Sequence, residues 1–128
     1  MPIAAVQLFS IPVSDQSRSR DFSVDAFGFE LVADIDMGPN QRWAQVRPPG
    51  AQTSITPVTW FETMPPGSTK GIVLETAYLD GDVDVLKSKG VAIDGDIEEM
   101  PWGRFVPFDD PDGNGIVLQV TANTKVPG

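Results

Sequence analysis

The stretch RFVPFDDPDGNGIVLQV, residues 104–120, holds two short apolar runs on either side of a segment rich in turn-forming residues. Read as a calcium loop, the segment would place Asp110, Asp112 and Asn114 at the first, third and fifth ligand positions. The twelfth position is then Thr121 instead of the bidentate Glu that such a loop needs, and the flanks are of strand type. Proline, glycine and asparagine in the segment favour a turn. The stretch therefore predicts a β-hairpin.

Outward from this hairpin, the chain divides into two halves with the same order of elements, strand, helix and three strands. In the first half we expect a helix over residues 18–27 and strands over 3–13, 29–34, 42–47 and 53–60. In the second half we expect a helix over 80–89 and strands over 71–76, 91–93, 104–108 and 116–120. A repeat of this kind is a signal of the fold. We expect module one at about 3–62, a linker at about 63–69, module two at about 70–121 and a tail at 122–128.

Two details of this pattern concern the helices and the acidic residues. In the first helix we expect Phe22 and Ala26 to share one face, and in the second helix we expect Val83 and Leu86 to face inward. Glycine follows each helix and is expected to end it. The acidic residues at 94–99 are expected to lie in a solvated loop.

Charge and composition limit the partners of the chain. Its 128 residues include 18 acidic and 9 basic side chains, which give a net charge of −9. This charge argues against nucleic acid or an anionic membrane surface as a partner. No apolar run approaches the roughly 20 residues that span a bilayer, and we expect no secretory signal, since no basic and then apolar segment stands at the start of the sequence. With no Cys in the sequence, we expect a cytoplasmic location.

The chain has neither His nor Cys, and this limits its chemistry. Histidine is the commonest general base and, with cysteine, the preferred ligand of zinc. Nucleophiles activated by histidine, such as those of serine or cysteine hydrolases, are therefore excluded. Any catalysis would depend on carboxylates and amides.

Five motifs occur in order along the chain: IPVSD at 11–15, FGFEL at 27–31, RWAQVRPPG at 42–50, LKSKGV at 86–91, and PWGRF at 101–105 with DDPDGNG after it. With the repeated element order, they resemble the vicinal oxygen chelate superfamily, which includes glyoxalase I, extradiol dioxygenases and the bleomycin and fosfomycin resistance proteins. The resemblance implies an α+β fold of two βαβββ modules that form a curved mixed sheet around a cleft. It also implies a homodimer.

Enzymes of this superfamily hold a divalent metal ion with side chains from both modules. By the resemblance, the ligand positions fall at Leu8, near Ile55 or Thr56, near Gly71, and at Val117. None of these residues is a competent ligand apart from the weak threonine hydroxyl. Gln7, Glu75 and Gln119 lie nearby but do not make a chelate. We therefore predict no metal and no other cofactor, and the metal-free, drug-sequestering resistance proteins are the better model.

Strand alternation predicts which residues would line the cleft. The expected lining residues are Leu8, Ser10, Trp43, Gln45, Thr56, Val58, Trp60, Val73, Glu75, Val117 and Gln119, with Trp102 near the mouth. Such a lining is apolar, with aromatic plates and a few polar groups, which suits a flat, drug-sized molecule. The alternative is that the tryptophans are ordinary core or interface residues.

Glu75 is the one acidic residue that we place inside the cleft. It could pair with a ligand cation or act as a base, or it could be paired with Arg47 or Arg104. The leading hypothesis is a protein that sequesters a toxic aromatic natural product, such as an antibiotic, for resistance or self-protection. The alternative is a metal-independent isomerase or cyclase that acts on a natural-product intermediate, with Glu75 as base and Gln45 or Gln119 orienting the substrate. A metal-dependent lyase or dioxygenase is the third hypothesis. Whether the chain is an enzyme stays open at this point.

Overall fold

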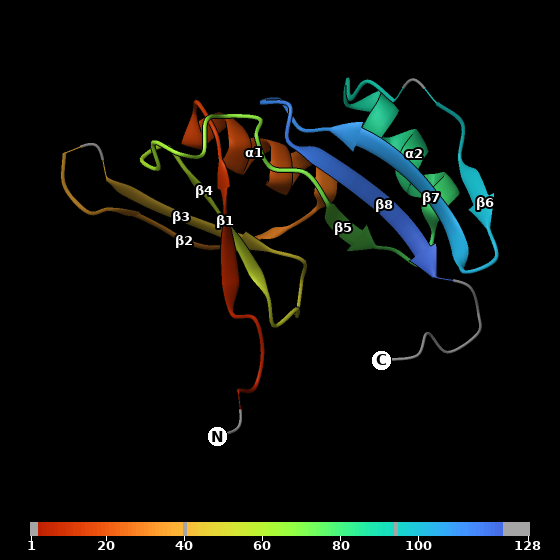
Figure 1. Cartoon of the computed structure of the whole chain (residues 1–128), viewed down its shortest axis with the longest axis horizontal. Coiled ribbons are helices and arrows are strands. Elements are labelled where there is room, and N and C mark those ends of the chain that lie inside the picture. Colours follow the sequence, from red (N-terminus) through yellow and green to blue (C-terminus); the bar gives the residue numbers. More distant parts are fainter. Residues whose placement is uncertain (1–2, 40, 94, 122–128) are drawn as a thin grey trace. The chain divides into compact units, whose positions relative to one another are not determined.

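The computed structural model describes residues 3–39, 41–93 and 95–121 (Figure 1). The chain forms two compact units, one of Met1–Thr69 with Pro111–Asn114 and one of Lys70–Asp110 with Gly115–Gly128. Each unit holds a four-stranded mixed sheet and one helix, in the order strand, helix and three strands. The predicted α+β fold of two βαβββ modules is therefore confirmed.

The first unit contains one helix between its first and second strands. Its elements are β1 (Leu8–Pro12), α1 (Gln16–Phe27), β2 (Glu30–Asp36), β3 (Arg42–Arg47) and β4 (Ser54–Val58). The strand order is β1-β4-β3-β2, with β1 parallel to β4 and the other neighbours antiparallel. β3 has the bounds that we predicted, whereas β1 begins later than expected and β4 ends before Trp60.

Helix α1 begins and ends at residues suited to those positions. The Asp15 side chain accepts a hydrogen bond from the Arg18 backbone N–H at 3.0 Å, and Gly28 ends the helix at a φ of 71°. The buried side chains of the helix are Ser19 and Ser23, one turn apart. Phe22 and Ala26, which we expected on one face, follow these serines by three residues each and are partly buried, so the four residues share a face of the helix.

Phe22 also belongs to an aromatic cluster near the end of the helix. The Phe22 ring meets the edge of Phe27 at 5.0 Å between centroids, and Phe27 lies 5.2 Å from Phe29. Phe29 is buried at the entry to β2. Aromatic contacts of this geometry are favourable beyond the area that they bury, so this cluster joins the end of the helix to the sheet.

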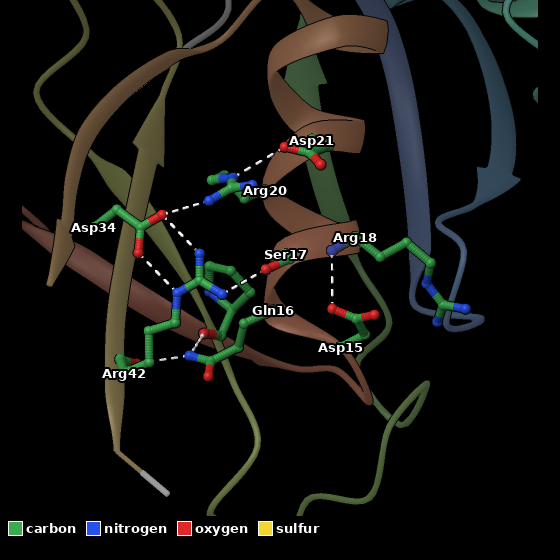
Figure 2. A network of polar contacts seen from close by, with 9 residues as sticks. Asp15, Gln16, Ser17, Arg18, Arg20, Asp21, Asp34 and Arg42 are labelled. Atoms are coloured by element: carbon green, nitrogen blue, oxygen red, sulfur yellow. Dashed lines mark hydrogen bonds and ion pairs between the residues drawn. The ribbon is translucent and has the colours of Figure 1, made fainter. Parts of the chain in front are cut away.

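A polar clamp joins α1 to β2 and β3, and we define it as Gln16, Ser17, Arg20, Asp34 and Arg42 (Figure 2). Arg42 Nε and Nη2 each donate to one carboxylate oxygen of Asp34 at 2.7 Å, and Arg20 Nη1 donates to Asp34 Oδ2 at 2.6 Å. Arg42 Nη1 donates to Ser17 Oγ, and Gln16 Nε2 donates to the backbone carbonyls of Arg42 and Pro57. The hydrogen bonds from Arg42, with those from Arg20, hold the pKa of Asp34 well below its usual range.

The predicted hairpin is confirmed, because β7 and β8 pair up to Asp109 and Gly115 around its turn. Residues 111–114 of the turn belong to the first unit. Asp112 Oδ1 accepts hydrogen bonds from the backbone and hydroxyl of Ser14 at 2.9 and 2.7 Å and from Arg18 Nη2 at 2.8 Å. Asn114 Nδ2 donates to the Pro12 carbonyl at 2.9 Å. The side chains that a calcium loop would need are thus bonded to protein groups.

The second unit contains β5 (Ile72–Glu75), α2 (Leu79–Ser88), β6 (Glu98–Met100), β7 (Gly103–Asp109) and β8 (Gly115–Thr121). Its strand order is β5-β8-β7-β6, with β5 parallel to β8. Val83 and Leu86 of α2 are buried, as predicted, together with Leu79. None of the helices in the described ranges is long and apolar enough to cross a membrane.

Two predictions for the second unit are wrong. Residues 91–93 do not form a strand, and Glu98 and Glu99 lie in β6 instead of a loop. Cross-strand pairing explains the second error, because Glu99 lies opposite Arg104 and its carboxylate is 3.3 Å from Arg104 Nε. Asp94 and the expected tail at 122–128 lie outside the described residues.

The clamp predicts a pH-dependent contribution to stability. Replacing Asp34→Asn keeps the size of the side chain but removes its charge, and we expect the free energy of unfolding to fall by about 1–2 kcal/mol at pH 7. Because the folded-state pKa is depressed, this contribution is complete above the unfolded pKa of about 3.9 and is lost as the pH falls through the folded pKa. Urea unfolding at several pH values should show the two proteins converging below about pH 4.

The matched control is Asp21→Asn, which removes a more exposed carboxylate that also contacts Arg20. We expect a change of less than about 0.5 kcal/mol there. An equal loss in both variants, or a difference for Asp34→Asn that persists unchanged at pH 2, would contradict the assigned role of the clamp.

Candidate ligand-binding faces

The helix-covered face and the opposite face of the first sheet can be told apart by strand register. Val46 pairs with Ile55, and Ala44 and Val46 are 1% and 0% exposed on the side of Arg42, where the helix residues contact β3. Trp43, Gln45 and Arg47 alternate with these residues along β3 and therefore lie on the side of the sheet away from the helix. We call that side the first open face; it consists of Leu8, Ser10, Trp43, Gln45, Arg47, Thr56 and Val58.

The members of the first open face differ in accessibility. Leu8, Ser10, Trp43 and Gln45 are partly exposed, whereas Thr56 and Val58 are only 0% and 1% exposed. The side chains of Thr56 and Val58 are therefore packed beneath their neighbours and are not accessible to a ligand in this structure. Their predicted role as ligand contacts stays a prediction, like that of the other members.

Trp60 does not share this face through strand alternation. It follows the end of β4, so the alternation that we used to place it does not apply there. Its ring meets the edge of Phe61 at 6.2 Å between centroids. Trp60 is partly buried, and its role in ligand binding is untested.

Hydrogen bonds fix several polar groups of the first open face. Trp43 Nε1 donates to Gln45 Oε1 at 3.1 Å, and the hydroxyls of Ser10 and Thr56 are 2.9 Å apart. Arg47 Nε donates to the Glu30 carboxylate, and this hydrogen bond lowers the pKa of Glu30. The face thus combines an indole plate with side chains whose orientation is set by neighbours.

The register of the second sheet brings four predicted residues together. Val73 pairs with Val117 and Glu75 with Gln119, and each pair alternates with buried neighbours such as Ile72, Ile116 and Leu118. The second open face consists of Val73, Glu75, Glu98, Met100, Phe105, Pro107, Val117 and Gln119. Val73 is 57% exposed, so an apolar surface is available there.

Sequence reasoning missed Phe105, Pro107 and Met100 on the second open face. The signal was present, since Phe105 and Pro107 alternate with the buried Val106 and Phe108 along β7. Met100 could not be found, because β6 was not predicted. Trp102 lies between β6 and β7 and is 54% exposed, so its ring is available for contact.

Glu75 differs from the expectation, because it is exposed and not buried. The two arginines that we considered as its partners have other carboxylate partners. Arg47 pairs with Glu30, and Arg104 pairs with Asp80 and Glu99. Exposure weakens the expectation that Glu75 acts as a base, since water screens its interactions.

The positions at which related enzymes hold a metal ion can now be placed. Leu8, Thr56 and Val117 lie on the open faces, whereas Ile55 lies on the helix-covered side. Gly71 precedes β5 at a φ of 85°. Among the residues that the structure describes, no three or more His, Cys, Asp or Glu side chains gather where they could hold a metal ion.

A polar groove of about 1060 Å³ lies in the first unit beside the clamp. It is lined by Gln16, Asp34, Asp36, Gly38, Pro39, Gln41, Arg42 and Thr59. Its charged groups already have partners in the clamp, and Asp36 Oδ1 accepts from the Gly38 N–H at 3.1 Å. The groove contains none of the predicted ligand-binding residues, and we do not assign the binding function to it.

Comparisons with known proteins agree with this architecture. The model of the Glyoxalase/Bleomycin resistance protein/Dioxygenase superfamily matches residues 5–118. The crystal structure of TnmS3, an antibiotic binding protein from Streptomyces sp. CB03234, is 51% identical, with a TM-score of 0.89 over 95% of this chain and 99% of that chain. A superfamily member from Sphaerobacter thermophilus is 40% identical, with a TM-score of 0.83 over 92% of this chain and 98% of that chain.

A match among curated proteins extends this similarity beyond solved structures. The uncharacterized protein YetH of Bacillus subtilis is 34% identical over 120 residues, which cover 91% of this chain and 98% of YetH. The family model covers nearly the whole described fold, including all residues of the two open faces except Gln119. The chain belongs to the Glyoxalase/Bleomycin resistance protein/Dioxygenase superfamily.

Proposed function

We propose that this chain binds a planar aromatic natural product in the cytoplasm and sequesters it, without a metal ion, in a cleft built by two copies of the chain. The observation that carries the proposal is the 51% identity to the antibiotic binding protein TnmS3 over 95% of this chain. The benefit to the cell would be antibiotic resistance or self-protection. Sequestration requires affinity but no catalytic group.

The chemistry of the candidate site supports binding more than catalysis. The sequence has no His and no Cys, and apolar residues or glycine stand at three of the family's metal-ligand positions. The one carboxylate that we considered as a base, Glu75, is exposed. A general base must be held within hydrogen-bond reach of the proton that it abstracts, and an exposed side chain is not held in a site closed to water.

The open faces supply what a flat ligand needs. Trp43 and Phe105 present aromatic surface, one on each face, and Val73 and Val117 add apolar surface. Aromatic rings bind planar ligands by offset stacking, and apolar surface that leaves water adds to affinity. Ile35 lies opposite Trp43 and is 54% exposed. The ligand or the second copy of the chain would cover large apolar side chains of this kind.

Native mass spectrometry of the chain with a panel of aromatic antibiotics and a divalent-metal mixture tests this proposal. We expect a dimer that carries up to two intact ligands and no metal ion, and the released ligand should have unchanged mass. A released compound with altered mass would make the chain an enzyme. Glu75→Gln would then be the next variant, and it should abolish turnover while leaving binding in place if Glu75 is the base.

Trp43 provides a second test. Replacing Trp43→Ala removes the aromatic plate, and we expect the affinity for a bound aromatic antibiotic to fall at least about tenfold, which corresponds to about 1.4 kcal/mol. Replacing Trp43→Phe retains a smaller plate and should keep the affinity within about threefold of the original. Isothermal titration calorimetry measures both. Unchanged affinity in a folded Trp43→Ala protein would contradict the assignment of the first open face as ligand-binding.

A further inference from the structure

We infer that the first open face selects planar aromatic ligands that carry oxygen acceptors, such as ring carbonyls, and that Gln45 donates the hydrogen bond that recognises them. This inference rests on the proposed binding function and specifies its ligand class. It depends on the hydrogen-bonding direction of three side chains of the face, which the structure determines.

The orientation of the Gln45 amide follows from its neighbour. An indole Nε1–H can only donate a hydrogen bond. The Gln45 atom that lies 3.1 Å from Trp43 Nε1 is therefore the carbonyl oxygen, and the amide nitrogen points elsewhere. Gln45 is partly exposed, and within the described ranges its Nε2 has no hydrogen-bond partner. The group that Gln45 offers to a ligand is thus an NH₂ donor beside an aromatic plate.

Arg47 adds further donors to the same face. It follows Gln45 on the open side of β3 and uses Nε to bond Glu30. Its two terminal nitrogens have no partner in the part of the chain that the structure describes, and a guanidinium group can only donate. Because Glu30 balances the charge of Arg47, the pair favours a ligand with hydrogen-bond acceptors and does not require a ligand with a full negative charge.

The acceptors of the face each receive a hydrogen bond from a protein group, whereas the donors on Gln45 and Arg47 do not have such a partner within the described ranges. Gln45 Oε1 receives the Trp43 N–H, and the Glu30 carboxylate receives Arg47. The hydroxyls of Ser10 and Thr56 bond to each other, and Thr56 is 0% exposed. A ligand that offers donors would therefore have to share an acceptor that already receives a hydrogen bond, whereas a ligand that offers acceptors would find the NH₂ of Gln45 and the guanidinium of Arg47.

The neighbouring strand leaves Gln45 accessible. Ala33 lies opposite Gln45 on β2, and Ile35 lies opposite Trp43. The methyl group of Ala33 is too short to cover the amide, while Ile35 widens the apolar surface beside the indole. A flat ring on Trp43 would thus place a carbonyl on its edge within reach of Gln45.

Three probes separate the ligand classes. Fluorene and 9-fluorenone have the same planar ring system and differ by one carbonyl oxygen, and proflavine is a planar cation that offers donors. Equilibrium dialysis of each probe against the dimeric protein should show 9-fluorenone binding at least about fivefold more tightly than fluorene. It should also bind more tightly than proflavine.

Gln45→Glu is the decisive variant, because it keeps an oxygen for Trp43 Nε1 but replaces the outward NH₂ donor with an acceptor. We expect the affinity for 9-fluorenone to fall at least tenfold, while that for proflavine is unchanged or rises. Gln52→Glu makes the same charge change at an exposed residue outside the face and should leave all three affinities within twofold. Gln45→Met, which also removes the donor, replaces the first variant if that one does not fold.

The outcomes distinguish this inference from the proposed function. Equal binding of fluorene and 9-fluorenone, or a folded Gln45→Glu protein with 9-fluorenone affinity within twofold of the original, overturns the ligand class while aromatic binding stands. Binding of none of the three probes by the unmodified protein overturns both the ligand class and the proposed function.

Discussion

The alternation of side chains along β3 is the constraint on which the candidate site depends. Arg42, Ala44 and Val46 point to the helix side, and Trp43 and Gln45 point away from it. A shift of one residue in the register would exchange the two sets. The shift is opposed by burial of Ala44 and Val46, which are 1% and 0% exposed, and by the bonds from Arg42 to Asp34 and Ser17. The same interactions that close the core thus fix the orientation of the candidate ligand-binding surface.

This arrangement separates structural polar groups from those available for recognition. On the helix side, the carboxylate of Asp34 accepts hydrogen bonds from both Arg20 and Arg42. The side-chain amide of Gln16 donates hydrogen bonds to two backbone carbonyls. On the open side, Trp43 and Gln45 bond to each other and leave donors exposed. Polar groups that are fully paired hold a structure in place, whereas partly satisfied groups next to an aromatic plate favour ligand binding.

The elements predicted most accurately from the sequence are those with strong local signals. The turn in DDPDGNG, the strand RWAQVR and the buried face of α2 follow from proline and glycine positions and from apolar periodicity. The errors occur where tertiary contacts override local preference. The acidic β6, for example, forms because Glu99 lies opposite Arg104 and pairs with it.

The positions of the predicted lining residues on the sheets were correct only in part, for the same reason. Strand alternation correctly places Trp43 with Gln45 and Val73 with Glu75, because these residues lie within regular strands. It does not apply to Trp60 beyond the end of β4, and it cannot tell that Thr56 is buried or that Glu75 is exposed. Burial depends on neighbours that are distant in sequence, and the hydrogen bond that orients the Gln45 amide can be known only from the folded chain.

A crystal structure of the chain with a bound aromatic antibiotic tests the central claim most directly. We expect the ligand ring to stack on Trp43 of the first open face, with an acceptor oxygen at hydrogen-bond distance from Gln45 Nε2 and no metal ion in contact. A ligand bound only in the polar groove beside Asp34 and Arg42, or coordinated through a metal ion, would contradict it.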